Sequence, residues 1–258
     1  APMRDILARR NLEVLEQFAC SKVLLAFDFD GTLAPIVADP DAARMRETTR
    51  ELLVAAAALY PCAVISGRRR SDVRERLAGV GGLEVIGNHG LEPSRNAQDY
   101  VARVLAFRAR FAATLGSFDG IEIEDKVYSL AIHYRRSREK KRVRAAILTT
   151  ARALDEARLV GGKQVVNVIP AGAPHKGIAL ERLRARLRCD TAVFVGDDET
   201  DEDVFVLDQP GRLLSIRVGV KRSSHAAYHV RGQRDIDRLL KALVGFGRAR
   251  ARLESRAI

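Results

Sequence analysis

Two aspartates, Asp28 and Asp30, stand at the end of an apolar run of strand length, "KVLLAFDF" at 22–29, and Gly31 and Thr32 come directly after them. A pair of carboxylates at the tip of a buried strand is costly unless a cation or a reaction uses it. Alternate residues of a strand project from the same side, so the one-residue spacing puts both carboxylates on one side. The glycine permits a sharp turn, so we expect backbone N–H groups to face an anion here.

Other polar residues stand where further predicted elements begin or end. Ser66 and Arg68 follow a second apolar strand, and Asp197 and Asp198 follow a third. Lys176 begins the helix before that third strand. Ligands of open parallel sheets bind beyond the carboxyl ends of the strands. If the strands are neighbours, these groups therefore converge on one crevice.

Such a group of residues is suited to phosphoryl transfer. Clustered carboxylates need a cation, and ligands that are all oxygen favour a hard ion such as Mg²⁺. One carboxylate can attack phosphorus to form an aspartyl-phosphate, and a second can protonate the leaving oxygen and then activate water. An ammonium group, a hydroxyl and the cation would offset charge on the phosphoryl oxygens.

The apolar patterns before residue 91 alternate between strand and helix. The predicted strands cover 22–29, 62–67 and 83–90, and the predicted helices cover 44–60 and 71–80, the latter with Ser71 as its N-cap. Alternation at this spacing is typical of a parallel α/β sheet.

The pattern differs between residues 91 and 172. A helix is predicted at 98–115, alternating strands at 120–135 with a turn near Asp125–Lys126, a basic helix at 137–157 and a strand at 163–170. Alternation of apolar and polar residues is typical of half-exposed antiparallel strands. This stretch is therefore predicted to be a separate α+β unit.

The α/β pattern returns after this unit. A helix is predicted at 176–189, strands at 191–198 and 212–219, and a basic helix from Asp235. The predicted layout is a parallel core formed by residues 1–90 and 173–258, interrupted by an inserted α+β domain at 91–172.

Composition narrows the class of protein. The 258 residues carry a net charge of +11, with 47% hydrophobic and 30% charged residues, as in an ordinary globular protein. Aromatic residues are only 5% with no Trp, so the arginine excess is interpreted as solvated helix faces rather than a nucleic-acid site.

Cysteine spacing and hydropathy indicate the cellular compartment in which the protein is expected. Cys20, Cys62 and Cys189 are far apart and are expected to be reduced core residues. No apolar stretch is long enough to span a membrane, and "APMRDILARR" lacks an apolar signal region. We expect a cytoplasmic protein with no membrane or nucleic-acid partner, and a monomer in preference to an oligomer.

Four short motifs carry a family resemblance. DFDGTL (28–33), SGR (66–68), Lys176 in "PHKG" and GDDETDED (196–203) resemble, in order, the motifs of the phosphatase branch of the haloacid dehalogenase (HAD) superfamily. That resemblance implies an α/β fold with a Rossmann-like parallel sheet core (HAD fold) and an inserted α+β cap domain of the C2 type.

Further stretches narrow the resemblance. "GNHGLE" (87–92), "EDKVYSLAIHYR" (124–135) and "PAGAPHKG" (170–177) are similar to segments of trehalose-6-phosphate phosphatases. The implied function is the Mg²⁺-dependent hydrolysis of a sugar phosphate, trehalose 6-phosphate in first place, through an aspartyl-phosphate.

The resemblance also implies roles for the residues in the four motifs. Asp28 would be the nucleophile and Asp30 the general acid and base, with Ser66 and Lys176 holding the phosphoryl group. The Asp28 side chain, the Asp30 backbone carbonyl and Asp197 would bind Mg²⁺, and Asp198 and Asp201 would act indirectly or through water. The implied substrate-binding residues are Gly31, Gly67, Arg68, Asn88, His89, Glu124, Lys126, His133 and Asn167.

Several of these residues also have a purely structural interpretation. Asn88 and His89 could only shape a loop, Glu124 and Lys126 could be an exposed hairpin pair, and His133 could be a structural histidine on an alternating strand.

Asn167 departs from the family pattern, which usually has a glutamate at this point. Asparagine is shorter and uncharged, although it still donates and accepts hydrogen bonds. The alternative substrates are therefore mannosyl-phosphoglycerate and sucrose 6-phosphate. A remote alternative is a non-catalytic protein that binds nucleic acid through its basic cap.

Overall fold

The computed structural model describes residues 3–93, 97–154, 156–162, 164–207 and 209–256. The chain divides into two compact units: a first unit of Ala1–Gly90 with Lys176–Ile258, and a second unit of Leu91–His175. The sequence placed the corresponding boundary at residue 172. Each unit has its own sheet and its own apolar core.

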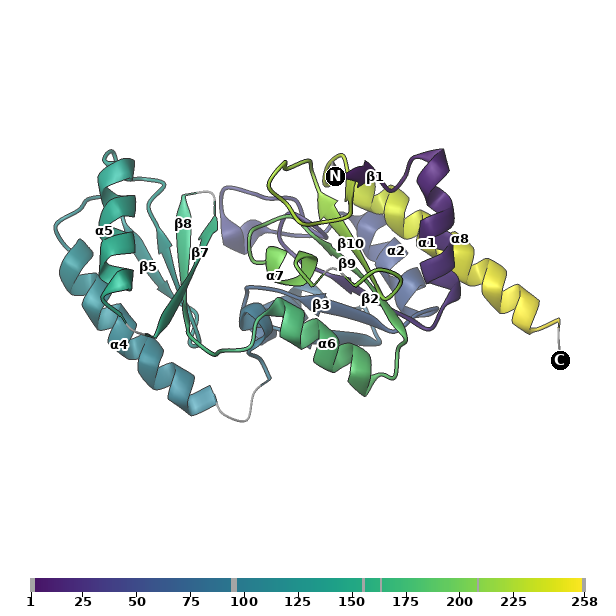
Figure 1. Ribbon diagram of the computed structural model, residues 1–258, viewed down its shortest axis with the longest axis horizontal. Coiled ribbons are helices and arrows are strands. Elements are labelled where there is room, and N and C mark those ends of the chain that lie inside the picture. Colours follow the sequence, from purple (N-terminus) through teal and green to yellow (C-terminus); the bar gives the residue numbers. More distant parts are fainter. Residues whose placement is uncertain (1–2, 94–96, 155, 163, 208, 257–258) are drawn as a thin grey trace. The chain divides into compact units, whose positions relative to one another are not determined.

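The first unit is built on a seven-stranded sheet with the order β1-β11-β10-β9-β2-β3-β4, in which every pair is parallel (Figure 1). The strands are β1 (Arg4–Asp5), β2 (Val23–Phe27), β3 (Cys62–Ile65), β4 (Leu83–Ile86), β9 (Thr191–Gly196), β10 (Leu213–Val218) and β11 (Tyr228–Val230). The predicted parallel α/β core is confirmed.

Helices cover both faces of this sheet (Figure 1). One face packs against α1 (Leu12–Cys20), α2 (Glu47–Ala57), α3 (Arg70–Arg76) and α8 (Asp235–Glu254), and the other against α6 (Lys176–Arg186) and α7 (Glu202–Phe205). In β2, Leu25 and Phe27 face the first set, whereas Leu24 and Ala26 face the second. Because both faces are buried, this strand is apolar at every position.

The described residues of the first unit also form three short 3₁₀ helices: η1 (Arg9–Asn11), η2 (Pro40–Ala42) and η3 (Asn88–Gly90).

The second unit has a four-stranded antiparallel sheet with the order β5-β6-β8-β7. Its strands are β5 (Glu122–Asp125), β6 (Leu130–His133), β7 (Ala157–Gly162) and β8 (Val165–Pro170), and its helices are α4 (Ala97–Leu115) and α5 (Lys140–Arg152). Leu130, Ile132 and Val168 pack with residues of both helices in one apolar cluster. The helices therefore cover one face of the sheet and leave the alternate residues on the other, which we call the open face.

Some details differ from the sequence predictions. Helix α3 begins at Arg70, so Ser71 lies inside its first turn rather than at the N-cap. Strand β7 was not predicted: it lies between the predicted helix 137–157 and the predicted strand 163–170, and an edge strand with half-buried residues has little periodicity of its own. Cys20 is exposed at the end of α1, although a core position was predicted.

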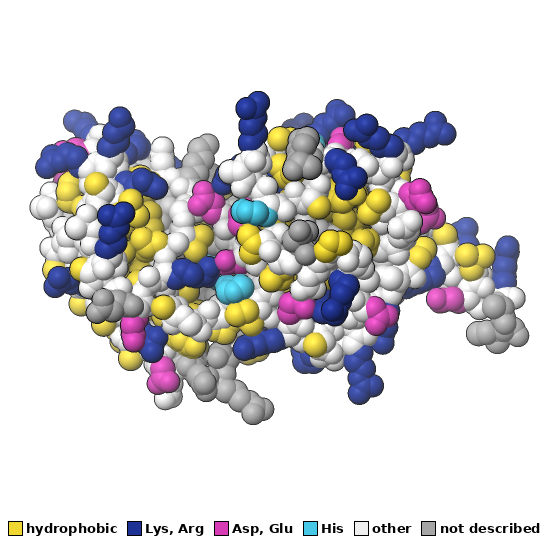
Figure 2. Space-filling model, viewed as in Figure 1, with side chains coloured by type: hydrophobic (Ala, Val, Ile, Leu, Met, Phe, Trp, Pro, Cys, Tyr) yellow, Lys and Arg dark blue, Asp and Glu magenta, His cyan; other side chains and the backbone are white. Residues whose placement is uncertain are grey.

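Charge is dispersed over the surface. Figure 2 shows Lys and Arg side chains scattered across the viewed face, with acidic side chains between them. Within the described part of the chain, no helix combines the length and the apolar character needed to cross a bilayer.

Candidate active site

The strands that precede the predicted catalytic residues are neighbours. β9, β2 and β3 lie side by side in that order, so Asp197, Asp28 and Ser66 emerge at one edge of the sheet. The chain runs from β2 to β3 and β4 on one side, and later fills the other side with β9, β10 and β11. The point between β2 and β9 is thus the topological switch point, where ligands of such sheets bind.

Lys176 lies at the centre of this edge. It is the first residue of α6, and only 1% of its surface is exposed. Its Nζ lies 3.0 Å from Oδ1 of Asp28 and 2.8 Å from Oδ1 of Asp201. A buried ammonium needs this pairing, and a cation at a helix N-terminus is otherwise unfavourable.

The loop after β9 is organised by Asp201, whose side chain is fully buried. Its Oδ2 accepts hydrogen bonds from the backbone N–H groups of Asp197 at 2.8 Å and Asp198 at 3.0 Å. A side chain at Gly196 would collide with Asp201, because its Cβ would lie 2.3 Å from the carboxyl carbon. Only glycine therefore allows the loop to fold over this carboxylate.

Asp198 is bound within its own loop. Its Oδ1 accepts hydrogen bonds from the N–H and the hydroxyl of Thr200, at 2.8 and 2.6 Å, and from the N–H of Asp201 at 3.2 Å. This carboxylate therefore shapes the loop that carries Asp197 and Asp201.

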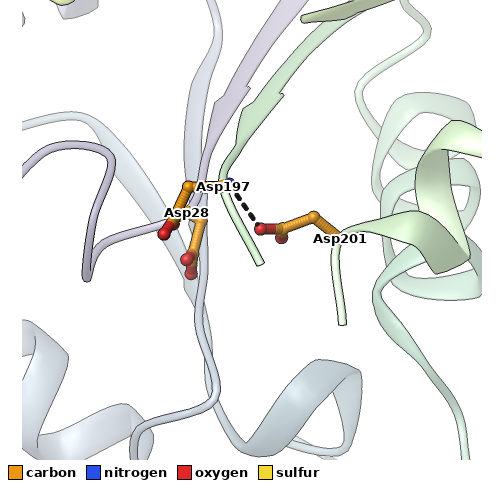
Figure 3. A group of neighbouring side chains, drawn as sticks. All are labelled: Asp28, Asp197 and Asp201. Carbon is orange, nitrogen blue, oxygen red and sulfur yellow. Dashed lines mark hydrogen bonds between the residues drawn. The ribbon is translucent and has the colours of Figure 1, made fainter. Parts of the chain in front are cut away.

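Three carboxylates form the candidate metal site. The ligand oxygens of Asp28, Asp197 and Asp201 all lie within 4.8 Å of one another. Figure 3 shows Asp28 and Asp197 side by side at the strand ends, with Asp201 pointing toward them from the opposite side. The donors are all oxygen and the cluster has an excess of negative charge beside a single lysine, so these residues fit a hard divalent cation.

The turn after Asp28 is packed tightly against this cluster. Gly31 has a φ of +80°, and a Cβ there would lie 2.1 Å from Oδ2 of Asp197. Its N–H donates to the carbonyl oxygen of Ala34 at 2.8 Å. That N–H is therefore used within the turn, and the glycine lets Asp197 approach; whether other N–H groups of the turn face an anion stays a prediction.

Burial and mutual repulsion shift the acidities of the cluster. Burial, offset in part by Lys176, raises the pKa of Asp28 well above its ordinary value. Burial together with Asp201 and Asp198 raises the pKa of Asp197 to about 8. Burial also raises the pKa of Asp201, to about 6. Without a bound cation, the cluster therefore holds protons near neutral pH.

For Lys176 and Asp198, neighbouring groups outweigh the effect of burial on the pKa. Burial alone would lower the pKa of Lys176, but Asp201 and Asp28 raise it well above its ordinary value. Burial would raise the pKa of Asp198, but Lys176 and the hydrogen bonds from Thr200 hold it below its ordinary value.

Asp30 is held by Arg68. The guanidinium donates to both carboxylate oxygens of Asp30, with Nε at 2.6 Å and Nη2 at 2.7 Å, and also pairs with Asp72 at 2.9 Å. The sequence assigned Arg68 to substrate binding, but its side chain is engaged with these two carboxylates. In this arrangement Arg68 orients Asp30.

The loops after β3 and β4 are joined at Ser66. Its Oγ is buried and accepts a hydrogen bond from the N–H of Arg68 at 3.1 Å, and its carbonyl oxygen accepts from the N–H of His89 at 2.9 Å. A Cβ at Gly67 would lie 2.5 Å from the His89 ring, so no side chain fits there. Within the described part of the chain, both polar side-chain atoms of Asn88 are buried without a hydrogen-bond partner.

The four predicted sugar-binding residues lie in the second unit. Glu124 and Asn167 both stand opposite Ala131 in the strand register, which puts them on the open face of the sheet. Oε2 of Glu124 lies 2.9 Å from Nε2 of His133 and 4.0 Å from Nζ of Lys126.

Asn167 is less accessible than the other three. Only 6% of its surface is exposed, and its Nδ2 lies 3.5 Å from the carbonyl oxygen of Val160. The structure therefore brings Glu124, Lys126 and His133 into one polar group, with Asn167 recessed on the same face.

Sequence reasoning missed Arg217, which lies on β10 beside the loop after β9. Its guanidinium donates to the backbone carbonyl oxygens of Asp197 and Asp198, and pairs with Glu202 at 3.1 Å. The sequence does contain a sign of this role: Arg217 is a charged residue inside the buried strand "RLLSIRVG", and a buried charge requires partners. Thr32 was also missed, and its hydroxyl donates to Oδ1 of Asp197 at 3.3 Å.

Comparison with known proteins decides the family. The trehalose-phosphatase family model matches residues 26–234. The chain belongs to this family. The resemblance to phosphatases of the HAD superfamily is thereby confirmed, and with it the class of chemistry, phosphoric monoester hydrolysis.

Named relatives agree with this assignment. The chain is 30% identical over 260 residues to probable trehalose-phosphate phosphatase 4 of Oryza sativa, covering 92% of this chain and 70% of that protein. It is 35% identical over 212 residues to the trehalose-phosphate phosphatase of Mycobacterium avium, covering 76% of this chain and 54% of that protein. The chain thus spans about half the length of the mycobacterial relative.

The fold is shared with solved structures. The C-terminal domain of C. albicans trehalose-6-phosphate phosphatase has a TM-score of 0.78 at 22% identity, over 95% of this chain and 99% of that chain. At that identity the likeness concerns the fold, and it confirms the predicted fold class.

Proposed function

We propose that this chain hydrolyses trehalose 6-phosphate to trehalose and phosphate. The observation that carries the proposal is the cluster at the switch point between β2 and β9, where Lys176 holds Asp28 beside Asp197. The names of the relatives in rice and Mycobacterium avium support trehalose 6-phosphate as the substrate.

In the first step, the Asp28 carboxylate attacks phosphorus and the bond from phosphorus to the sugar oxygen breaks. The leaving oxygen takes a proton from Asp30, and the product is an aspartyl-phosphate on Asp28. Lys176 and the Ser66 hydroxyl stabilise the negative charge of the transferring group. Arg68 keeps the Asp30 carboxyl group oriented for the proton transfer.

In the second step, Asp30 removes a proton from a water molecule that attacks the phosphorus. The bond to Asp28 breaks, phosphate leaves, and both aspartates return to their starting states. Asp30 thus acts first as an acid and then as a base, which its half-exposed position allows.

Magnesium is the cation we propose for this site. Asp28, Asp197 and Asp201 would hold it, with the Asp30 backbone carbonyl as a further oxygen ligand, while Asp198 and Arg217 keep the loop in place. When bound, Mg²⁺ supplies positive charge that stabilises the phosphoryl oxygens.

The open face of the second unit is the proposed sugar-binding surface. Glu124, Lys126 and His133 present charged and hydrogen-bonding groups there, and Asn167 adds an amide. Such groups can discriminate strongly between sugars, because a missing hydroxyl leaves them unpaired. Since Asn167 replaces the usual glutamate, mannosyl-phosphoglycerate and sucrose 6-phosphate remain the alternative substrates.

A panel assay of phosphate release tests this proposal. Trehalose 6-phosphate is expected to give the highest kcat/KM among trehalose 6-phosphate, sucrose 6-phosphate, mannosyl-phosphoglycerate and glucose 6-phosphate. If trehalose 6-phosphate is turned over no faster than glucose 6-phosphate, the substrate proposal is wrong, although phosphatase chemistry would still stand.

A further inference from the structure

A basic pocket lies in the first unit, apart from the aspartate cluster. Its volume is about 660 Å³. Its charged lining residues are Lys22, Arg184, Arg188, Asp190 and Arg212. Four of these five residues are cations, so the pocket has the electrostatic character of an anion site.

The pocket lies at the opposite end of the sheet from the proposed active site. Lys22 immediately precedes β2, Asp190 precedes β9 and Arg212 precedes β10, whereas Asp28 and Asp197 follow β2 and β9. These parallel strands are five or six residues long. The two sites are therefore separated by roughly 15–20 Å. A ligand in this pocket does not reach the reacting phosphoryl group.

One of the four cations has a structural role. Arg184 is buried, pairs with Glu181 at 2.7 Å, and donates to the backbone carbonyl oxygens of Cys189 and Asp190 at 3.3 and 3.2 Å. It forms the floor of the pocket and fixes the turn between α6 and β9.

The other three cations are available for a ligand. Their side chains are exposed, and within the described residues none makes an ion pair or a side-chain hydrogen bond. They are Lys22, Arg188 and Arg212. Against them stands the single carboxylate of Asp190, so the accessible groups leave an excess of positive charge.

Arg188 supports a ligand in a second way. It has a φ of +55°, in the left-handed region just after the end of α6. Glycine is strongly favoured at such a position, because it has no Cβ to collide with the backbone. An arginine in this conformation is less stable than a glycine would be. The guanidinium that Arg188 adds to the pocket lining is a reason for an arginine at this position.

The chemistry of the lining residues indicates which kind of anion the pocket would bind. Guanidinium groups bind phosphate oxygens through paired hydrogen bonds, and a volume of this size suits a small molecule. None of the described residues that line the pocket is aromatic, so they offer no platform on which nucleic-acid bases would stack. We propose that this pocket binds a small polyphosphate anion, either inorganic tripolyphosphate or the triphosphate group of a nucleotide.

Such a ligand would tie together several elements of the first unit. Its contacts would join the starts of β2 and β10 to the segment after α6, the helix that begins with Lys176. We therefore expect binding to raise the unfolding temperature. The inference is independent of the proposed substrate, because it concerns a separate set of residues.

Isothermal titration calorimetry of the whole chain tests the inference. The titrations use metal-free protein in about 0.15 M salt, where exposed charges are screened beyond about 8 Å. Tripolyphosphate and ATP are both expected to bind, tripolyphosphate at least as tightly, and adenosine is expected not to bind. If ATP binds and tripolyphosphate does not, the base is being recognised and the proposal is wrong.

Two charge-matched variants locate the binding. The pocket variant Lys22→Gln/Arg188→Gln/Arg212→Gln is expected to bind tripolyphosphate at least about a hundredfold more weakly, since several charge-assisted hydrogen bonds are lost. The control variant Arg9→Gln/Arg222→Gln/Arg248→Gln removes the same charge from exposed positions outside the pocket and is expected to bind like the parent chain.

Other outcomes overturn the inference. Equal weakening in both variants would mean that the net positive charge alone attracts the anion. Unchanged binding in the pocket variant, or no binding by the parent chain, would equally exclude this site. Thermal unfolding of both variants checks that they fold, and the single changes Arg188→Gln and Arg212→Gln replace the triple variant if it does not.

Discussion

The guanidinium of Arg68 binds both carboxylate oxygens of Asp30, at 2.6 and 2.7 Å, and the same guanidinium reaches Asp72 at 2.9 Å. Asp72 lies in α3, a helix that packs on the sheet of the first unit. The proposed general acid is therefore oriented by an arginine that is itself anchored to a helix. The substrate-binding role predicted for Arg68 stays a prediction, and its contacts with Asp30 and Asp72 suggest a positioning role to be tested beside it.

Replacing Arg68 with lysine tests this positioning role. Lysine keeps the charge but cannot reproduce the two-pronged contact with Asp30. We expect Arg68→Lys to lower kcat by about 10²-fold with a much smaller change in KM, because Asp30 would be misplaced for proton transfer. Steady-state kinetics across pH 5–8 measure this.

A matched control for that change is Arg70→Lys, since Arg70 lies two residues along and donates to the backbone of Val85 rather than to Asp30. It is expected to keep kcat nearly unchanged. A large rise in KM with constant kcat in Arg68→Lys would instead indicate direct substrate binding by Arg68.

Replacing Asp28 with asparagine tests the covalent mechanism. The amide is a poor nucleophile, so phosphate release is expected to fall by at least about 10³-fold with every sugar phosphate. The fold should persist, because Lys176 keeps its contact with Asp201 at 2.8 Å and the change removes a carboxylate from a crowded cluster. Thermal unfolding shows whether the Asp28→Asn variant is folded. Retained turnover in a folded variant contradicts the covalent mechanism.

Replacing Gly31 with alanine tests the close approach of Asp197. The new Cβ would lie 2.1 Å from Oδ2 of Asp197, so the carboxylate must move and phosphatase activity is expected to be largely lost. Gly79→Ala is the matched control: its φ of +87° imposes a similar backbone strain, but a Cβ there meets nothing within 4 Å. Stability should fall in both variants, by about 1 kcal/mol in the control. Equal activity in the two variants would show that the approach is unimportant.

Divalent cations are expected to stabilise the protein more at high pH than at low pH. Burial and neighbouring carboxylates raise the pKa of Asp197 to about 8 and that of Asp201 to about 6. Between about pH 4 and 8 these two carboxylates therefore hold more protons in the metal-free folded state than in the unfolded state, so their contribution to stability falls as pH rises. Mg²⁺ binds the deprotonated carboxylates and competes with protons for them. The stabilisation that Mg²⁺ gives is therefore expected to increase as pH rises.

Thermal unfolding with Mg²⁺ or with a chelator, at pH 5 and pH 8, measures this difference. Saturation at about a hundred times Kd would add about 2.7 kcal/mol to the free energy of unfolding at 25 °C. Asp197→Asn should abolish the gain, and Glu13→Gln, at an exposed position on α1, should keep it. An equal gain at both pH values would contradict a site made of these carboxylates.

The local chemistry of the site could be predicted from the sequence. Asp28 and Asp197 each follow a continuous apolar run, and such runs form strands buried on both faces, which place the next polar residues at the edge of a sheet. Lys176 begins a helix, as predicted. These conclusions depend on residues that are near one another in the chain, so pattern and spacing were sufficient.

Long-range contacts could not be predicted in this way. Arg68 and Asp30 are 38 residues apart, and Lys176 and Asp28 are 148 apart, so their pairing depends on the strand order β9-β2-β3. The role of Arg217 likewise appears only when β10 lies beside β9. The close fit of Gly31 against Asp197 also appears only in the folded chain.

The family and the fold class could be predicted from the sequence alone, because both follow from local pattern and from the order of the motifs, whereas the attack of Asp28 on phosphorus stays a prediction. The tertiary structure decided which carboxylate faces which cation. It also decided that the starts of β2 and β10 and the segment after α6 gather three exposed cations in one pocket. The physical reason is that charge acts through space, so its effect depends on distances that only the folded chain sets.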